Sequence, residues 1–189
     1  MPPRTNSHAQ KFDAASLQRF GQSLLTACGL VEDRARDVAE VLLEGDLLGH
    51  TTHGFALLPA YLKELKEGMM EKTGEPNIIA DHGSALTWDG RHLPGPWLVR
   101  QAIAAARERL AKHPVVTVSI RRSHHIGCLQ AYLRPVTDAR LLMLLVQPPT
   151  AVLPESGPPE PRLRTATTSA PPTGSGTPHP IPASAPSRA

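Results

Sequence analysis

The sequence predicts an α/β protein in which an N-terminal helical layer is followed by a mixed region of strands and helices. Up to about residue 70, apolar residues recur at the helical spacings of three and four. Between about residues 77 and 147, short strand-like runs alternate with helical stretches, an order that favours at least one crossover connection. After residue 147 the composition changes abruptly. We therefore expect a flexible segment 1–11, a folded region 12–147 and a disordered tail 148–189.

Three helices form the predicted N-terminal layer. The first begins after an N-cap at Asp13 and ends at Gly29. The other two are expected over about 33–48 and 58–67, each followed by a glycine. Their apolar spacing buries one face of each helix. In the first helix that face is expected to comprise Leu17, Phe20, Leu24 and Cys28.

The second region begins with a predicted hairpin, because two short β-like runs flank Asp81-His82-Gly83. The elements expected after it are a helix over 97–110, a strand over 115–120, a helix over 129–139 and a wholly apolar strand over 141–146. If the sheet ends there, that last strand leaves an apolar edge that invites association.

The tail differs from the rest of the chain in composition. Residues 148–189 hold 12 of the 20 prolines and contain no aromatic residue and no Asp. Such a segment buries too little apolar surface to offset the entropy of ordering it. We therefore predict that the tail is disordered.

Charge and composition exclude several classes of protein. The formal net charge is +3, the basic residues are scattered, and aromatic residues make up 4% of the chain. A nucleic-acid interface needs a clustered basic face, so none is expected. No run is apolar enough for a signal peptide or a membrane span. The two cysteines lack Cys-x-x-Cys spacing, which favours free thiols and a cytoplasmic protein.

Two histidine-rich turns are the candidate chemistry of the chain. His50, Thr52 and His53 lie where the second helix ends, and His125 follows the strand over 115–120. Histidine exchanges protons near neutral pH, and ligand sites of α/β sheets gather at the carboxyl ends of strands. A helix starting near Gly127 would help to keep His125 neutral. The alternatives are a polar helix-capping turn at the first cluster and a surface-loop histidine at the second.

Other kinds of site fit the pattern less well. His50 and His53 have the i, i+3 spacing of metal ligands, but no Cys or carboxylate accompanies them at ligand spacing, so no metal is predicted. A histidine-based metal module stays a minor alternative. The chain has no Gly-x-Ser-x-Gly elbow and no Gly-rich Rossmann or P-loop motif.

Two blocks of sequence resemble a known family. One reads Asp46-Leu-Leu-Gly-His-Thr-Thr-His-Gly54 and is followed by Leu58-Pro-Ala-Tyr-Leu62. The other reads Arg121-Arg-Ser-His-His-Ile-Gly-Cys-Leu-Gln-Ala-Tyr132. Both resemble motifs of the type-2 malate/L-lactate dehydrogenases, whose first signature is approximately Asp-Leu-x-Gly-His-x-Ser/Thr-His-Gly. The similarity covers roughly residues 12–147.

The resemblance implies a dehydrogenase that uses NAD or NADP to interconvert small 2-oxo and 2-hydroxy acids. It implies an α/β fold other than the Rossmann fold, and a homodimer. By similarity His53 is the acid/base, and His125 is a second pocket histidine that takes the proton role in some members. Which of the two carries the proton stays open. Thr52 and His50 are expected to contact the substrate, and no cofactor-binding residue is assigned.

The chain departs from the family pattern in three places. Leu57 stands where many members have an Arg that pairs with the substrate carboxylate, and Arg140 stands where relatives commonly have Gly. Beyond residue 146, relatives continue with a cofactor-binding half, whereas this chain has its Pro-rich tail. We therefore expect an N-terminal fragment of the family. The alternative function is that of a non-catalytic remnant that acts at most as an interaction or dimerisation module.

Overall fold

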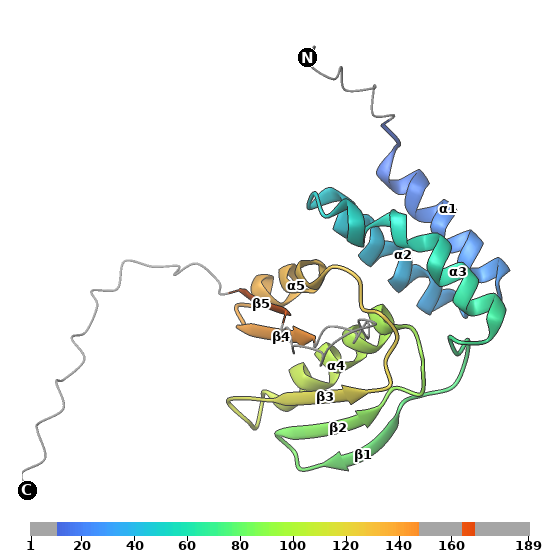
Figure 1. Cartoon of the computed structure of the whole chain (residues 1–189). Helices are drawn as coiled ribbons and strands as arrows, with labels where there is room; N and C mark the ends of the chain where they lie inside the picture. Colours follow the sequence, from blue (N-terminus) through green and yellow to red (C-terminus); the bar gives the residue numbers. More distant parts are fainter. Residues whose placement is uncertain (1–10, 148–163, 169–189) are drawn as a thin grey trace, which may run out of the picture.

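The structure is a computed structural model that describes residues 11–147 and 164–168. It has an N-terminal group of helices beside strands that are covered by further helices (Figure 1). The predicted α/β class is confirmed. Residues 1–10, 148–163 and 169–189, which include nearly all of the predicted flexible N-terminus and most of the predicted disordered tail, lie outside the described residues.

Three α-helices form the N-terminal layer, as predicted. They are α1 (Ala14–Ala27), α2 (Glu32–Leu47) and α3 (Leu58–Glu67), and two short 3-10 helices, η1 (Thr51–His53) and η2 (Phe55–Leu57), join α2 to α3. Gly68 ends α3 in the left-handed conformation, with φ of 73°. The first core lies between these helices; its largest fully buried side chains are Leu25, Leu30, Leu42, Tyr61, Leu65 and Met70.

The buried face of α1 differs from the predicted one. Asp13 caps the helix as expected, since its carboxylate accepts a hydrogen bond from Ser16 N at 2.8 Å. Phe20, however, is 56% exposed, and the fully buried positions are Gly21 and Leu25. The Phe55 ring packs so closely on Gly21 that a Cβ there would lie 2.6 Å from the ring. Leu17, Leu24 and Cys28 are partly buried, so the buried face overlaps the predicted one and is centred on Gly21 and Leu25.

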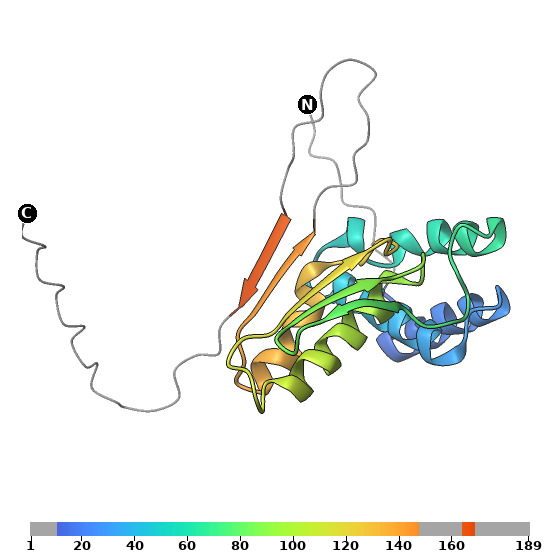
Figure 2. The same cartoon turned by 90° about the horizontal axis from the view of Figure 1, so that it is seen from below.

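A three-stranded sheet follows within the described residues. The predicted hairpin is present: β1 (Asn77–Asp81) runs antiparallel to β2 (Ala85–Asp89). β3 (Thr117–Arg121) lies parallel to β2, and α4 (Gly95–Arg109) is the crossover between them. The order β1-β2-β3 therefore places the carboxyl ends of β2 and β3 side by side (Figure 2).

The predicted helix over 129–139 is divided into the 3-10 helix η3 (Leu129–Tyr132) and α5 (Leu133–Asp138). Pro135 explains the division, because it has no N–H to donate to the carbonyl of Ala131 and is tolerated only in the first turn of an α-helix. The buried side chains of Val41, Val99, Ile126 and Tyr132 form a second core, to which η3 contributes Tyr132.

The last apolar strand is paired. β4 (Met143–Gln147) runs antiparallel to β5 (Arg164–Thr168) in a separate two-stranded sheet (Figure 2). The prediction that this strand is left as an open edge is therefore wrong on the side where β5 pairs, and residues 164–168 of the tail form a strand. Leu142, Leu144 and Val146 are exposed, while Met143 and Leu145 pack against the second core.

Candidate active site

The segment that carries His53 is held close against α2. At Gly45 a Cβ would lie 2.7 Å from the carbonyl oxygen of His53, so only glycine permits this approach. The next residue, Asp46, accepts a hydrogen bond from Phe55 N at 2.9 Å through its carboxylate. Asp46 thus fixes the chain just after His53. Asp46 stands in the first motif, but the motif does not indicate this supporting role, because the contact joins residues nine positions apart.

The loop that carries His125 leaves the carboxyl end of β3, as the sequence predicted. The Tyr61 hydroxyl donates to the His125 carbonyl oxygen at 2.7 Å and lies 3.5 Å from His125 Nδ1. Gly127 N donates to the same Nδ1 at 3.0 Å. Since Nδ1 accepts, a neutral His125 carries its proton on Nε2.

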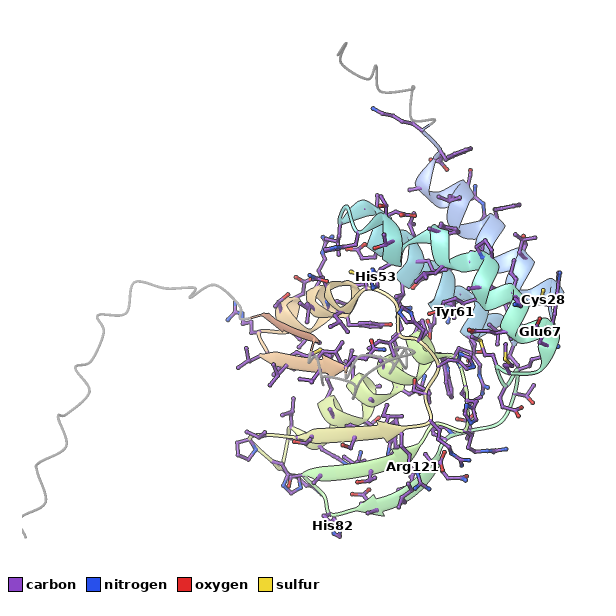
Figure 3. The ribbon with its side chains drawn as sticks, viewed as in Figure 1. Cys28, His53, Tyr61, Glu67, His82 and Arg121 are labelled. Carbon is purple, nitrogen blue, oxygen red and sulfur yellow. The ribbon has the colours of Figure 1, made fainter. Side chains whose placement is uncertain are left out.

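The structure brings the two predicted catalytic histidines together. The ring centroids of His53 and His125 lie 5.8 Å apart, with 33° between the ring planes. The Thr52 hydroxyl lies 2.9 Å from His53 Nδ1. Figure 3 shows His53 on the same side of the molecule as Tyr61, with His82 at the opposite end on the hairpin. Two segments distant in sequence therefore present adjacent imidazoles.

His50, which the resemblance implies as a substrate contact, makes backbone hydrogen bonds to residues on both sides of it. Its carbonyl accepts from His53 N at 2.8 Å, and its own N–H donates to Gly45 O at 2.8 Å. The imidazole itself is exposed. The described contacts of His50 thus shape the backbone of η1, and its contact with substrate stays a prediction.

Two buried tyrosines, which sequence analysis did not assign to the site, hold the His125 loop. Tyr61 was expected only on the buried face of the third helix. It is 2% exposed, and burial raises the pKa of its hydroxyl, so the group stays a donor. Tyr132, equally buried, donates to the Ile126 carbonyl. The Tyr in the Leu-Pro-Ala-Tyr-Leu motif was the available signal, since a buried phenol needs a partner.

Removing the Tyr61 hydroxyl is expected to destabilise the fold. Tyr61→Phe leaves the His125 carbonyl without its buried donor, so the free energy of unfolding should fall by about 1–3 kcal/mol. Urea denaturation followed by circular dichroism measures this. Lys63→Ala, on the exposed part of the same helix, is the control. A Tyr61→Phe midpoint equal to that of the unaltered chain would contradict the role of the hydroxyl.

Asp89 anchors the start of the His125 loop at the end of β2. Only 2% exposed, it accepts from Arg121 at 3.0 Å, from Arg122 at 2.8 Å and from Arg91 N at 3.0 Å. Arg122 adopts φ of 51°, a strained conformation that this carboxylate holds in place. Above all, the hydrogen bond from Arg122 keeps the pKa of Asp89 well below its ordinary value. No sequence motif indicated this anchor.

The depressed pKa of Asp89 predicts acid sensitivity. A carboxyl whose pKa is lower in the folded than in the unfolded state stabilises the fold above its unfolded pKa, and that contribution is lost as the pH falls towards the folded pKa. We expect Asp89→Asn to be less stable than the unaltered chain at pH 7, with the difference narrowing below about pH 4. Denaturation at several pH values tests this, with the exposed Asp138→Asn as control. A difference that does not change with pH would contradict it.

The described residues suit the part of a hydride-transfer site that binds the carbonyl group of the substrate. Imidazole N–H groups suit a carbonyl oxygen that becomes an alkoxide. The side chains placed beside the pair, Thr52 and Tyr61, carry no positive charge for the phosphates of a dinucleotide. Residues that would hold NAD or NADP are thus not assigned within the part of the chain that the structure describes.

Among these described residues, no group of three or more His, Cys, Asp or Glu side chains could hold a metal ion. Cys28 and Cys128 are free thiols. No helix in the described ranges is long and apolar enough to cross a membrane.

Known proteins share this arrangement of sequence and fold. A family profile described as malate/L-lactate dehydrogenase matches residues 12–180, so the similarity extends beyond residue 147, where the motifs had suggested that it ends. The chain is 32% identical over 117 residues to hydroxycarboxylate dehydrogenase B of Escherichia coli O157:H7, covering 62% of this chain and 32% of that protein. It is 31% identical over 134 residues to L-lactate dehydrogenase of Cupriavidus necator, covering 71% and 38%.

A solved structure agrees with the sequence matches. The crystal structure of a dehydrogenase from Sinorhizobium meliloti superposes with a TM-score of 0.69 at 28% identity, covering 72% of this chain and 43% of that one. The chain thus spans about a third of the length of the curated relatives it matches. The profile match covers most of the sequence, including both histidine turns. The chain belongs to the malate/L-lactate dehydrogenase family.

Proposed function

We propose that this chain carries the substrate end of an NAD(P)-dependent dehydrogenase that interconverts small 2-oxo and 2-hydroxy acids. The observation that carries the proposal is the His53–His125 pair, with ring centroids 5.8 Å apart. Each imidazole comes from a loop that other residues fix, which is the preorganisation that proton transfer needs. Because the chain spans about a third of its curated relatives, the activity of the whole family is a proposal for this chain.

The pair would bind and protonate the carbonyl oxygen of the substrate. When bound, the nicotinamide would supply the hydride. We assign the proton to His53, and we assign to His125 the hydrogen bond from Nε2–H that stabilises negative charge on the same oxygen. The Thr52 hydroxyl lies 2.9 Å from His53 Nδ1, and its expected contact with the substrate stays a prediction. As the imidazolium, His53 gives its Nε2 proton to the substrate oxygen and becomes neutral with its remaining proton on Nδ1, which donates to the Thr52 hydroxyl oxygen; we therefore assign Thr52 the role of orienting the ring.

Substrate preference is expected to differ from that of relatives with Arg at position 57. Leu57 is partly buried and packs against the first core. A leucine cannot form the bidentate pair by which Arg orients a carboxylate. We therefore expect the chain to accept substrates whose carboxylate is bound by a residue other than the one at position 57.

The first test is cofactor binding followed by a substrate screen. The purified full chain is titrated with NADH and with NADPH by nicotinamide fluorescence, and 2-oxo acids are then screened by loss of nicotinamide absorbance. Saturable binding and turnover are expected. A folded chain that binds neither nucleotide would contradict the proposal and leave family membership as ancestry.

A second candidate function is a non-catalytic association module. Three apolar side chains on one face of the last strand region, Leu142, Leu144 and Val146, are between 41% and 70% exposed. Such a face favours association with a second copy or a longer relative. Analytical ultracentrifugation of the full chain and of Leu144→Glu tests this, because a dimer through this face should dissociate in the variant.

We place either function in the cytoplasm on the ground that both cysteines are free thiols.

A further inference from the structure

The residue next to His125 makes contacts that the proposed reaction does not use. His124 Nδ1 lies 3.0 Å from a carboxylate oxygen of Glu64, on α3. Its other ring nitrogen, Nε2, lies 2.8 Å from the carbonyl oxygen of Met69, just beyond the end of that helix. The His124 side chain is 14% exposed. Both ring nitrogens of a largely buried imidazole therefore face oxygen atoms of one segment.

These contacts specify a protonation state. A backbone carbonyl and an ionised carboxylate can only accept hydrogen bonds, and a neutral imidazole has a single N–H. The hydrogen bond from Nε2 to the Met69 carbonyl and the attraction between Nδ1 and the Glu64 carboxylate are satisfied together only when the His124 ring carries two protons. Loss of one proton would release either Glu64 or Met69 and remove the charge that attracts the Glu64 carboxylate.

Helix α3 holds two consecutive residues of the loop. Tyr61 and Glu64 lie one turn apart, so their side chains project from the same face of the helix. Tyr61 binds the His125 carbonyl at 2.7 Å, and Glu64 binds the His124 ring. A change at His124 would therefore be transmitted directly to the backbone that carries the His125 imidazole.

The loop after β2 also faces His124. The His92 ring lies 6.3 Å away, centroid to centroid, and is the other titratable group facing it from the loop after β2. His124 N donates to Leu93 O at 3.3 Å in that loop. The preceding Arg122 is bound by Asp89, which offsets its charge. Glu64 is the carboxylate that the structure places in contact with the His124 ring.

We propose that His124 is a positioning residue which, in its doubly protonated form, ties the His125 loop to Glu64 and Met69 and so makes the orientation of His125 dependent on pH. The consequence for catalysis rests on the proposed function. The contact itself does not, because it concerns the position of a loop in the free chain.

The test follows the imidazole nitrogens by NMR in the full chain labelled with ¹⁵N-histidine, between about pH 5 and about pH 8. The variants are His124→Gln, Glu64→Gln and the double variant; the controls are His82→Gln, in the exposed hairpin turn, and Glu67→Gln, exposed on the same helix. Circular dichroism checks that each chain is folded. Glu64→Gln keeps the shape of the side chain, so it tests the charge even if His124→Gln unfolds.

In the unaltered chain at low pH, both His124 nitrogens should give signals of protonated imidazole. The signals of His125 Nδ1 and the Gly127 amide should shift as His124 loses a proton. In His124→Gln and in Glu64→Gln, the shift of the His125 Nδ1 and Gly127 amide signals that accompanies loss of the His124 proton should disappear. The double variant should behave like the single variants, and the two control variants should keep this shift. His125 signals whose pH dependence is the same in all variants would overturn the proposal.

Activity separates this proposal from the proposed function. If the unaltered chain reduces 2-oxo acids, His124→Gln should lower kcat most at low pH and approach the unaltered rate at high pH, whereas a merely structural role would lower it equally at all pH values. If the unaltered chain binds no nucleotide but the His125 signals respond to Glu64→Gln, the proposed function fails and the positioning role stands.

Discussion

His53→Gln is expected to lower kcat for 2-oxo-acid reduction by about 10²–10⁴-fold, the usual contribution of a general acid. Glutamine can place an N–H group near the position of an imidazole nitrogen, but it cannot release a proton to an alkoxide. The variant should still bind substrate, so KM should change much less than kcat. Stopped-flow or steady-state absorbance of the nicotinamide measures both parameters.

The same experiment on His125 decides between the two imidazoles. His125→Gln keeps a hydrogen-bond donor for the substrate oxygen. If His53 supplies the proton, the kcat of His125→Gln should fall by about 10–10²-fold, less than that of His53→Gln. The reverse order would assign the proton to His125. His82→Gln, in the exposed turn of the hairpin, is the control and should keep full activity. Equal and small effects of both pocket substitutions would contradict proton transfer by the pair.

Gly95→Ala is expected to be the most destabilising small substitution near the site. Gly95 opens α4, and a Cβ there would lie 2.8 Å from the His125 carbonyl carbon and would overlap the carbonyl oxygens of His124 and His125. Backbone cannot rotate away as a flexible side chain can, so either the helix or the loop must shift. Overpacking of this kind costs about 1–3 kcal/mol, and backbone contact places Gly95→Ala at or above the upper end.

Two measurements together test the Gly95 contact. Urea denaturation should show the loss of stability, and the ¹⁵N signals of His125 should move in whatever fraction remains folded. Gln101→Ala, on the exposed side of the same helix, is the matched control and should be within about 0.5 kcal/mol of the unaltered chain. A Gly95→Ala chain with unchanged stability and unchanged His125 signals would show that the loop is not pressed against α4.

These predictions share one physical basis, which is that the His125 loop is held from several directions. Asp89 binds its first residues, α3 binds its middle through Tyr61, and Gly95 lets α4 pack against its backbone. Each contact comes from a different element of the fold. These contacts therefore hold the His125 imidazole in a fixed position, although the loop has no regular secondary structure between β3 and η3.

Most of the secondary structure could be predicted from the sequence because its signals are local. Asp13 as a cap and the turn Asp81-His82-Gly83 act within a few residues, and the structure shows both where they were expected. The prediction that Phe20 is buried was wrong because its burial depends on which segment packs against α1, and the apolar periodicity of the helix does not contain that information. Residues 164–168 were assigned to the disordered tail because their pairing with β4 is a contact between distant segments.

The family, the α/β class and the two histidine turns could be recognised without coordinates, since motif residues and apolar spacing are local features of the sequence. The packed fold was needed to show that the His53 and His125 rings are adjacent, that the Thr52 hydroxyl lies 2.9 Å from His53 Nδ1, and that the backbone of His50 bonds to Gly45 and His53. It also revealed the supports at Asp46, Tyr61, Asp89 and His124. The physical reason is that contacts such as those of His125 with Tyr61 and of His124 with Glu64 join residues far apart in the chain and exist only after the elements have packed, whereas the short-range contacts of His50 and Thr52 depend on backbone and rotamer geometry that a motif does not specify.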